Sequence, residues 1–375
     1  MRSVALAVFG ALAGLSLVSP RQAPAGEPAE RLPVMIRSLT LKETADGYGW
    51  ELTQVPMPTV GEHQVLVHVR AISLNHDDLP PKRRIPNVNL TGVEIGSDAA
   101  GDIVAIGKAV TDFHDGERVT NTYFRNWTNG TPLRAQIHRA KVPGVAADYI
   151  ALDDTAVTAI PDGYSYEEAA TFPTAGVTAW VATAGRNQLG RDKVVLIEGT
   201  GGVSTFALQF AAATGARVIL TSSSDGKLQR TLKIAPHESI NYRSVPMWSR
   251  RVLELTGGRG ADLVVDVGGK STLPQAVSSL APAGTLSIVG GLTGYDGEIP
   301  ASGLLGIVAK AQGVFVGSRA DFRNMLAFMR KHRLHPVIDR MFPLKEYEQA
   351  MSLLQSDEFI GKIVLRLDES SPPQR

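Results

Sequence analysis

The segment Lys193-Val-Val-Leu-Ile-Glu-Gly199-Thr-Gly201-Gly202-Val-Ser204 decides the fold of this 375-residue chain. An apolar run typical of a buried strand leads directly into a glycine-rich turn, and the turn leads into a helix over 203–214. Glycines let the backbone turn tightly and approach a diphosphate, while the N-terminus of the helix offers free N–H groups and a positive dipole end. Ser204 stands where the third glycine of the GxGxxG pattern would be, and it is small enough for close helix–strand packing. The segment therefore predicts a site for the diphosphate of a dinucleotide, with a glycine turn that binds no ligand as the alternative.

Strand and helix patterns alternate downstream of this turn. We expect strands over 217–221, 239–242, 263–267 and 285–289, and helices over 203–214, 227–233 and 247–255. The expected strands are short, continuous apolar runs, which are typical of a parallel sheet that is covered on both faces. This order predicts an α/β fold with a doubly wound parallel sheet.

The region upstream of the turn has short strands broken by turns, from Met35 to about Ile160. Gln64–Arg70 alternates polar and apolar residues, as a half-buried strand does. Gly361–Arg366 reads as a further strand that rejoins this β-rich domain. We therefore expect a signal peptide over 1–25, a linker over 26–33, a β-rich domain over 34–160, a dinucleotide-binding domain over 161–305, and a C-terminal part over 306–375 that completes the β-rich domain.

The N-terminal segment has the order of a secretory signal. Arg2 precedes an apolar run over 4–18, and small residues follow at Ala23–Ala25. The run is too short for a comfortable transmembrane helix, so that no stable membrane span is expected. If the signal is used, the mature protein is periplasmic or secreted; otherwise it is cytoplasmic. The alternatives are an uncleaved anchor and an upstream extension that is never used.

Composition excludes several classes of function. The chain has 38 basic and 37 acidic side chains, a net charge of +1, so that no basic excess is available to neutralise nucleic-acid phosphates. It has no cysteine, which excludes disulfides and thiolate-ligated metal ions. These numbers favour a globular enzyme that acts on a small molecule.

The residues after the second expected strand indicate which dinucleotide binds. An NAD site usually places an acid there to hold the ribose 2′-hydroxyl, but this chain has Thr221–Ser224. The hydroxyl and N–H groups of Ser222 and Ser223 can hold a phosphate, and Lys227 can supply positive charge. Asp225 weakens this reading unless it caps the next helix. The pattern favours NADPH over NADH.

Further short stretches, taken in chain order, resemble one family. They are Gly96–Gly107, Phe113–Val119, Phe124–Gly130, Glu167–Ala170, Thr178–Trp180, Gly199–Val203, Ile240–Tyr242, Gly317–Arg319 and Gly361–Val364. Together they span about residues 35–366 and resemble the medium-chain dehydrogenase/reductase superfamily, in particular its zinc-less alcohol dehydrogenase-like and quinone oxidoreductase branch. The resemblance implies a GroES-like catalytic domain that is split in sequence around a Rossmann domain, with the active site between them. It also makes a homodimer or a homotetramer the expected assembly.

The resemblance implies the residues that hold the cofactor. In quinone reductases a lysine and the tyrosine of an Asn-Tyr pair bind the 2′-phosphate, and Lys227 and Tyr242 match them. The other expected cofactor contacts are Thr174, Gly199, Thr200, Gly201, Gly202, Val203, Ser222, Ser223, Gly268, Gly290, Gly317 and Arg319. At the positions that match the zinc ligands of metal-dependent relatives stand Asn75, Ser97 and Thr174, whose neutral oxygens bind zinc poorly. We therefore expect no metal.

The stretch Ser73–Asp78 resembles the family's Ser-Leu-Asn-Tyr-Arg-Asp segment beside the nicotinamide. By this resemblance Asn75 could donate to the substrate or to the carboxamide, and Asp78 could orient its neighbours. His76 replaces the usual tyrosine and could act as a proton donor, or it could be an exposed loop histidine. Tyr123 and Trp127 could line an apolar substrate pocket, or they could belong to the core.

These observations predict a zinc-independent, NADPH-dependent oxidoreductase that transfers hydride to a quinone or to an α,β-unsaturated carbonyl or aldehyde. Such substrates are already activated, so that positioning and hydrogen bonds can replace a metal ion. Two alternatives stay open at this point: an NAD(P)-dependent alcohol dehydrogenase without zinc, and a nucleotide-binding protein with little catalysis.

Overall fold

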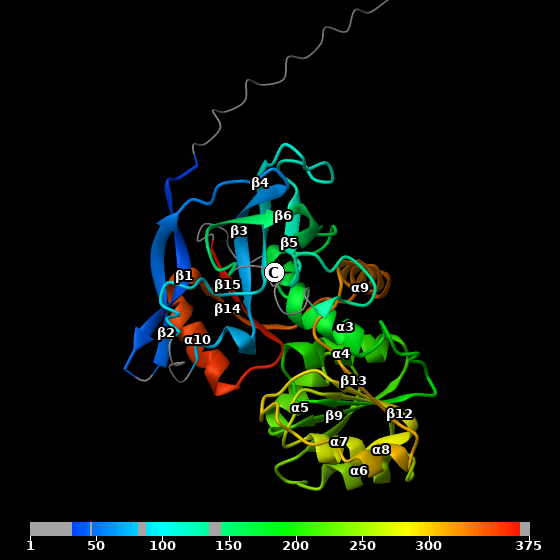
Figure 1. Cartoon of the computed structure of the whole chain (residues 1–375). Helices are drawn as coiled ribbons and strands as arrows, with labels where there is room; N and C mark the ends of the chain where they lie inside the picture. The colour runs from blue at the N-terminus through cyan, green and yellow to red at the C-terminus, as the bar shows by residue number, and fades with distance from the viewer. Residues whose placement is uncertain (1–31, 46, 82–87, 135–143, 368–375) are drawn as a thin grey trace, which may run out of the picture. The chain divides into compact units, whose positions relative to one another are not determined.

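A computed structural model describes residues 32–45, 47–81, 88–134 and 144–367 (Figure 1). The expected signal peptide and most of the expected linker lie outside these residues. None of the described helices is both long enough and apolar enough to cross a membrane.

The predicted parallel sheet is present and has six strands in the described residues, in the order β10-β9-β8-β11-β12-β13. Every neighbouring pair in it is parallel. The strands are β8 (Val194–Glu198), β9 (Arg217–Ser222), β10 (Glu238–Asn241), β11 (Ala261–Asp266), β12 (Leu280–Ile288) and β13 (Lys310–Gly313). The first five agree with the apolar runs in the sequence, whereas β13 was not expected.

Helices cover both faces of this sheet, as the continuous apolar strands predicted. They include α4 (Gly202–Ala213), α5 (Asp225–Thr231), α6 (Trp248–Leu255), α7 (Leu273–Ser278), α8 (Ala301–Leu305) and α9 (Arg319–His332). Successive residues of β8 belong to opposite hydrophobic clusters: Val195 and Ile197 pack with α4 and α9, and Leu196 packs with α6 and α7. The α/β fold class is therefore confirmed.

The β-rich domain contains a second sheet of seven strands in the described residues, with the path β14-β15-β3-β4-β5-β7 and β6 paired to β3. Its strands are β3 (Gln64–Leu74), β4 (Ala99–Ile106), β5 (Arg118–Asn121), β6 (Tyr149–Asp153), β7 (Val157–Ala159), β14 (Ile338–Pro343) and β15 (Lys362–Arg366). A separate antiparallel hairpin joins β1 (Met35–Thr44) to β2 (Gly47–Pro56). Short helices α2 (Tyr166–Ala169) and α3 (Val177–Ala182) follow β7, and α10 (Tyr347–Ser356) precedes β15.

The predicted return of the chain end is confirmed by β15, which pairs antiparallel with β3 from Ile363 opposite Leu74 to Arg366 opposite Ala71. In Figure 1 the red β15 accordingly lies beside the blue β3. This pairing carries Gly361 and Lys362 to the glycine-rich turn after β8, where Gly361 N donates to the carbonyl of Thr200 at 2.9 Å. The β-rich and parallel sheets are therefore joined by main-chain contacts at that turn.

Candidate active site

A cleft of about 1130 Å³ lies along the carboxyl edge of the parallel sheet. One side is formed by the glycine-rich turn, 199–204, and by the end of β9, 222–224. The other side includes Asn75–Asp77 of the β-rich domain and Lys362. Segments of both domains therefore form a single concave site.

The glycine-rich turn has the geometry that a close ligand approach requires. Gly199 has a φ of +76°, which favours glycine, and its N–H donates to the carbonyl of Thr221 at 2.9 Å. The Ser204 hydroxyl donates back to the carbonyl of Glu198 at 2.7 Å, which ties the first turn of α4 to β8. A Cβ on Gly202 would meet the Cδ of Lys362 at 2.5 Å. This cradle at a helix N-terminus fits a dinucleotide diphosphate.

One end of the cleft collects hydroxyl and basic groups. It is lined by Ser222, Ser223, Lys227 and Tyr242, the residues that the sequence singled out for a 2′-phosphate. The ammonium of Lys227 donates to the carbonyl of Asp357, in the segment between α10 and β15. This end of the cleft therefore presents hydroxyl and ammonium donors, and the binding of a 2′-phosphate to them stays a prediction.

Two arginines at this end were not singled out from the sequence. Arg230 and Arg243 also line the cleft. Arg243 could have been predicted, because it directly follows Tyr242 in the sequence. Asp225 accepts a hydrogen bond from Asn241 Nδ2 at 3.0 Å and begins α5, so that its carboxylate is held by a neighbouring strand. The acid that weakened the NADPH reading therefore has a structural partner.

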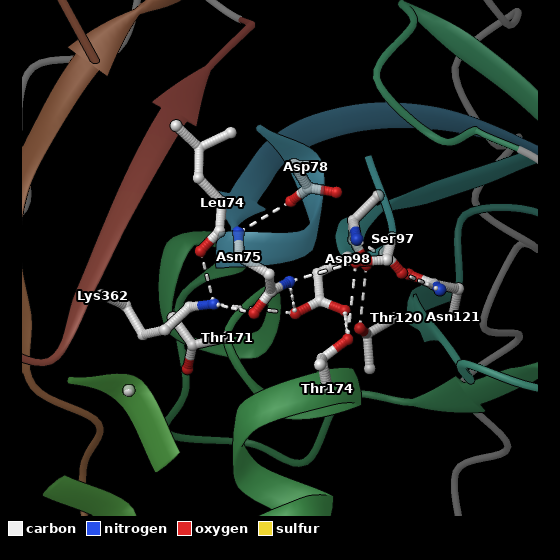
Figure 2. Close-up of polar contacts among 12 residues, drawn as sticks. Leu74, Asn75, Asp78, Ser97, Asp98, Thr120, Asn121, Thr171, Thr174 and Lys362 are labelled. Carbon is white, nitrogen blue, oxygen red and sulfur yellow. Dashed lines mark hydrogen bonds and ion pairs between the residues drawn. The ribbon is translucent and has the colours of Figure 1, made fainter. Parts of the chain in front are cut away.

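A buried polar network surrounds Asn75 and Lys362 (Figure 2). We call this part of the cleft its reacting end, because the nicotinamide is expected beside Ser73–Asp78. Asn75 Nδ2 donates to Ser97 Oγ at 3.1 Å and to Asp98 Oδ2 at 2.9 Å. Asn75 Oδ1 accepts from Lys362 Nζ at 2.5 Å, and Thr174 Oγ1 donates to Asp98 Oδ1 at 2.5 Å. Both amide hydrogens of Asn75 are thus directed at protein acceptors, so that its expected role as a donor to the substrate stays a prediction and would require a rearrangement.

Asp98 and Lys362 are charged groups inside this network that the sequence reasoning did not assign. Asp98 is fully buried, and the side chain of Lys362 is 3% exposed. Burial raises the pKa of Asp98 and lowers that of Lys362, while their mutual attraction acts in the opposite sense on each. Asp98 and Lys362 each lie in a stretch that resembles the family, Gly96–Gly107 and Gly361–Val364. The two side chains come close together only because β15 pairs with β3.

The three positions that match the family's zinc ligands do come together, but their chemistry does not fit a zinc ion. Asn75, Ser97 and Thr174 contribute only amide and hydroxyl groups, and these already bond to one another and to Asp98. The ammonium of Lys362 on Asn75 Oδ1 would also repel a cation. Among the described residues there is no group of three His, Cys, Asp or Glu side chains placed to hold a metal.

The turn that carries His76 is well anchored. Asp78 is 6% exposed, its Oδ2 accepts from the N–H of Asn75 at 2.7 Å, and its carbonyl accepts from Trp50 Nε1 at 3.0 Å. Asp78 therefore stabilises this turn without lining the cleft, whereas His76 and Asp77 do line it.

Tyr123 lines the cleft and is 6% exposed. Its ring packs edge-on against Phe124 and Phe315, with ring centroids 4.8 and 5.7 Å apart. Burial, and then the nearby carboxylate of Asp77, raise the pKa of Tyr123 well above its ordinary value, so that the phenol stays protonated at neutral pH. Tyr123 therefore contributes both an apolar surface and a neutral hydroxyl to the lining of the cleft.

The structure brings most of the expected site residues to this one cleft. Those that line it are Asn75, His76, Tyr123, Thr174, Gly199, Thr200, Gly201, Gly202, Val203, Ser222, Ser223, Lys227, Tyr242 and Gly290. Asp78, Trp127, Gly268, Gly317 and Arg319 are not in its lining. Trp127 is 5% exposed and packs on Phe124, and its carbonyl accepts from the N–H of Arg319.

A glycine-rich turn on a parallel sheet, facing a β-rich domain across a cleft, defines a dinucleotide-binding oxidoreductase fold. Residues 202–331 match the family of zinc-binding dehydrogenases, and residues 61–162 match the alcohol dehydrogenase GroES-like domain. The chain belongs to the medium-chain dehydrogenase/reductase superfamily, and it is an NAD(P)-dependent oxidoreductase.

Individual relatives agree with this assignment. A zinc-type alcohol dehydrogenase-like protein of Schizosaccharomyces pombe is 39% identical over 81% of this chain and 91% of its own length. The quinone oxidoreductase of Pseudomonas aeruginosa is 29% identical over 81% of this chain and 91% of its own length. The solved structure of an NAD-dependent alcohol dehydrogenase is 28% identical, has a TM-score of 0.78, and is matched over 88% of this chain and all of the other.

Proposed function

We propose that this chain is an NADPH-dependent reductase of quinones or α,β-unsaturated carbonyl compounds, including aldehydes, and that it works without zinc. The observation that carries the proposal is the polar network at the reacting end, where the ammonium of Lys362 lies against Asn75 Oδ1 at 2.5 Å. The charge of that ammonium would oppose a Lewis-acid metal at this position, which supports a substrate that is already activated.

The choice of NADPH rests on the opposite end of the cleft. Ser222, Ser223, Lys227 and Tyr242 would hold the 2′-phosphate, and the turn over 199–203 would hold the diphosphate. No carboxylate side chain occupies the end of β9, at Thr221–Ser224, where an NAD site usually has one. The positive charge of Lys227 would therefore favour the phosphorylated cofactor.

The residues of the β-rich domain would bind and orient the substrate. A nicotinamide held in the cleft would supply the hydride. The neutral Tyr123 hydroxyl and the His76 ring both line the cleft, and they could donate hydrogen bonds to the substrate oxygen as it gains negative charge. His76 is the group that would deliver a proton to the substrate. Phe315 and Tyr123 would exclude water from one side.

The test is a cofactor-oxidation screen at 340 nm, with NADPH and NADH offered separately against quinones, enones, aldehydes and simple ketones, in the presence of a chelator. We expect NADPH oxidation with quinones or enones and much slower rates with simple ketones. Purified protein that binds NADPH but oxidises it with none of these classes would refute the proposal and would favour a nucleotide-binding role.

Alcohol oxidation is the second candidate. The observation that favours it is the similarity to proteins described as alcohol dehydrogenases, among them the NAD-dependent alcohol dehydrogenase of known structure. Initial rates with primary alcohols and NADP⁺ or NAD⁺, set against those with quinones and NADPH, separate the two reactions. Faster turnover with alcohols would replace the first proposal by this one.

A further inference from the structure

We propose that Lys362 is a positioning residue: its ammonium, compensated by Asp98, fixes the side-chain amide of Asn75 and so holds the turn that presents His76 to the cleft. This inference rests on the proposed function only for its kinetic readout, because the geometry that it describes can also be measured in the absence of turnover.

The position of Lys362 makes its charge expensive. The side chain is 3% exposed, its ammonium donates to the carbonyl of Leu74 at 2.6 Å and to Asn75 Oδ1 at 2.5 Å, and Asp98 Oδ2 lies 3.9 Å away. Figure 2 shows the ammonium between these acceptors. A buried ion pair is often no more stabilising than well-packed apolar side chains of the same volume. Stability alone therefore does not explain why β15 carries a lysine here.

The pair determines which way the Asn75 amide faces. Its oxygen meets the ammonium of Lys362, and its nitrogen meets the carboxylate of Asp98. A flipped amide would place its NH₂ group against the ammonium and its oxygen against the carboxylate, and both contacts are repulsive. Lys362 and Asp98 together thus hold one orientation of the amide.

The fixed amide in turn holds the reacting end of the cleft. Asn75 is the N-cap residue of the short helix His76–Asp78. The backbone N–H of Asn75 donates to Asp78 Oδ2 at 2.7 Å. A displacement of Asn75 would therefore displace His76, which lines the cleft. Misplacement of a reacting group by about 1 Å can lower turnover by about 100-fold.

The direction of the lysine argues for positioning rather than for phosphate binding. Its stem lies against the glycine-rich turn, since a Cβ on Gly202 would come within 2.5 Å of its Cδ. Its ammonium, however, bonds to Leu74 and Asn75 on the side of the β-rich domain. A lysine that served the diphosphate would direct its ammonium at the turn.

The experiment compares Lys362→Met with the double variant Asp98→Asn/Lys362→Met. The single variant leaves a buried carboxylate without its cation, so that both the melting temperature and kcat should fall, with kcat lower by at least about 10-fold. The double variant removes both charges, so that the melting temperature should recover while kcat stays low. The Kd for NADPH, measured by fluorescence, should stay within about 3-fold of the wild type in both variants. Lys108→Met is the matched control, because the Lys108 side chain is 77% exposed and pairs with Glu62 at the surface.

Three outcomes would overturn the inference. Recovery of kcat together with the melting temperature in the double variant would make the pair purely structural. A large rise in the Kd for NADPH with kcat unchanged at saturating cofactor would make Lys362 a phosphate ligand. A nuclear magnetic resonance readout is independent of turnover: the Asn75 side-chain amide hydrogens, assigned with Asn75→Asp, should exchange slowly in the wild type and rapidly in the double variant. Equal, rapid exchange in both would refute the positioning role, whereas a wild type that reduces no carbonyl substrate but retains the slow exchange would count against the proposed function alone.

Discussion

Lys227→Ala is the substitution that tests most directly whether the cleft recognises the 2′-phosphate of NADPH. Lys227 lines the cleft beside Ser222 and Ser223, and its ammonium donates to the carbonyl of Asp357. NADPH and NADH differ only in the phosphate on the ribose. The ratio of their affinities therefore isolates the contact that Lys227 makes with this group, since the loss of the Asp357 contact is common to both cofactors.

The size of the effect follows from the type of contact. A hydrogen bond to a charged group contributes about 1.5–3 kcal/mol. Lys227 is partly exposed, so that solvent screening places the expected value near the lower limit of that range. Because about 1.4 kcal/mol corresponds to a factor of ten, the Kd for NADPH should rise roughly 10- to 30-fold. The Kd for NADH, which has no such phosphate, should change by about 3-fold or less.

The assay is the change in cofactor fluorescence on titration, at low and at high salt. The loss should be larger at low salt, where screening of the phosphate charge is weaker. Lys233→Ala is the control, since Lys233 lies just beyond the same helix, is exposed, and is absent from the cleft lining. An equal loss of affinity for NADPH and NADH would mean that Lys227 serves the fold of the cleft and does not read the phosphate.

Three further substitutions or treatments test the rest of the site. Gly202→Ala should weaken NADPH and NADH alike, because the new Cβ would meet Lys362 Cδ at 2.5 Å and Ala175 Cβ at 3.1 Å, and an unchanged Kd for both would contradict the close packing of the turn. Glu198 is buried, and its burial, and then Asp266, raise its pKa, so that the folded state loses stability as the pH rises above the ordinary carboxyl pKa. The free energy of unfolding of Glu198→Gln should therefore exceed that of the wild type by an amount that grows as the pH rises above the ordinary carboxyl pKa, by up to ~1.4 kcal/mol per pH unit, and a gain that does not depend on pH would oppose this account. Dialysis against a zinc chelator should leave the reductase rate unchanged, and elemental analysis should find much less than one zinc ion per chain. A rate that falls on dialysis and returns when zinc is added would exclude the zinc-independent proposal.

The sequence predicted the parallel sheet well because its signals are local. The strand expected over 193–198 is β8, Val194–Glu198, and the helix expected over 203–214 is α4, Gly202–Ala213. The strand β13 was missed because Lys310-Ala-Gln-Gly313 has neither an apolar run nor an alternating pattern. It is a strand through its pairing with β12, which is a tertiary contact that composition does not encode.

The site shows the same division between local and distant signals. The glycine-rich turn and the hydroxyl-rich end of β9 could be found because each is a continuous motif with a mechanical reason for its residues. Asp98 and Lys362 could not be paired from the sequence, because their contact depends on the register of β15 on β3. Arg319 illustrates the reverse case: its motif resembled the family, yet its guanidinium lies over the ring of Phe113 and not in the cleft lining.

The segment between α10 and β15 links the two ends of the cofactor site. Asp357, which ends α10 with a φ of +56°, presents its carbonyl to Lys227 at the phosphate end. A few residues later Gly361 N–H donates to Thr200 in the glycine-rich turn, and Lys362 reaches Asn75 at the reacting end. Because one short segment makes all three contacts, a shift at the phosphate end would be transmitted along the main chain to the residues that hold the reacting end. Side chains that share such a network usually show non-additive effects, so that we expect the effects of Lys227→Ala and Lys362→Met on kcat to be non-additive.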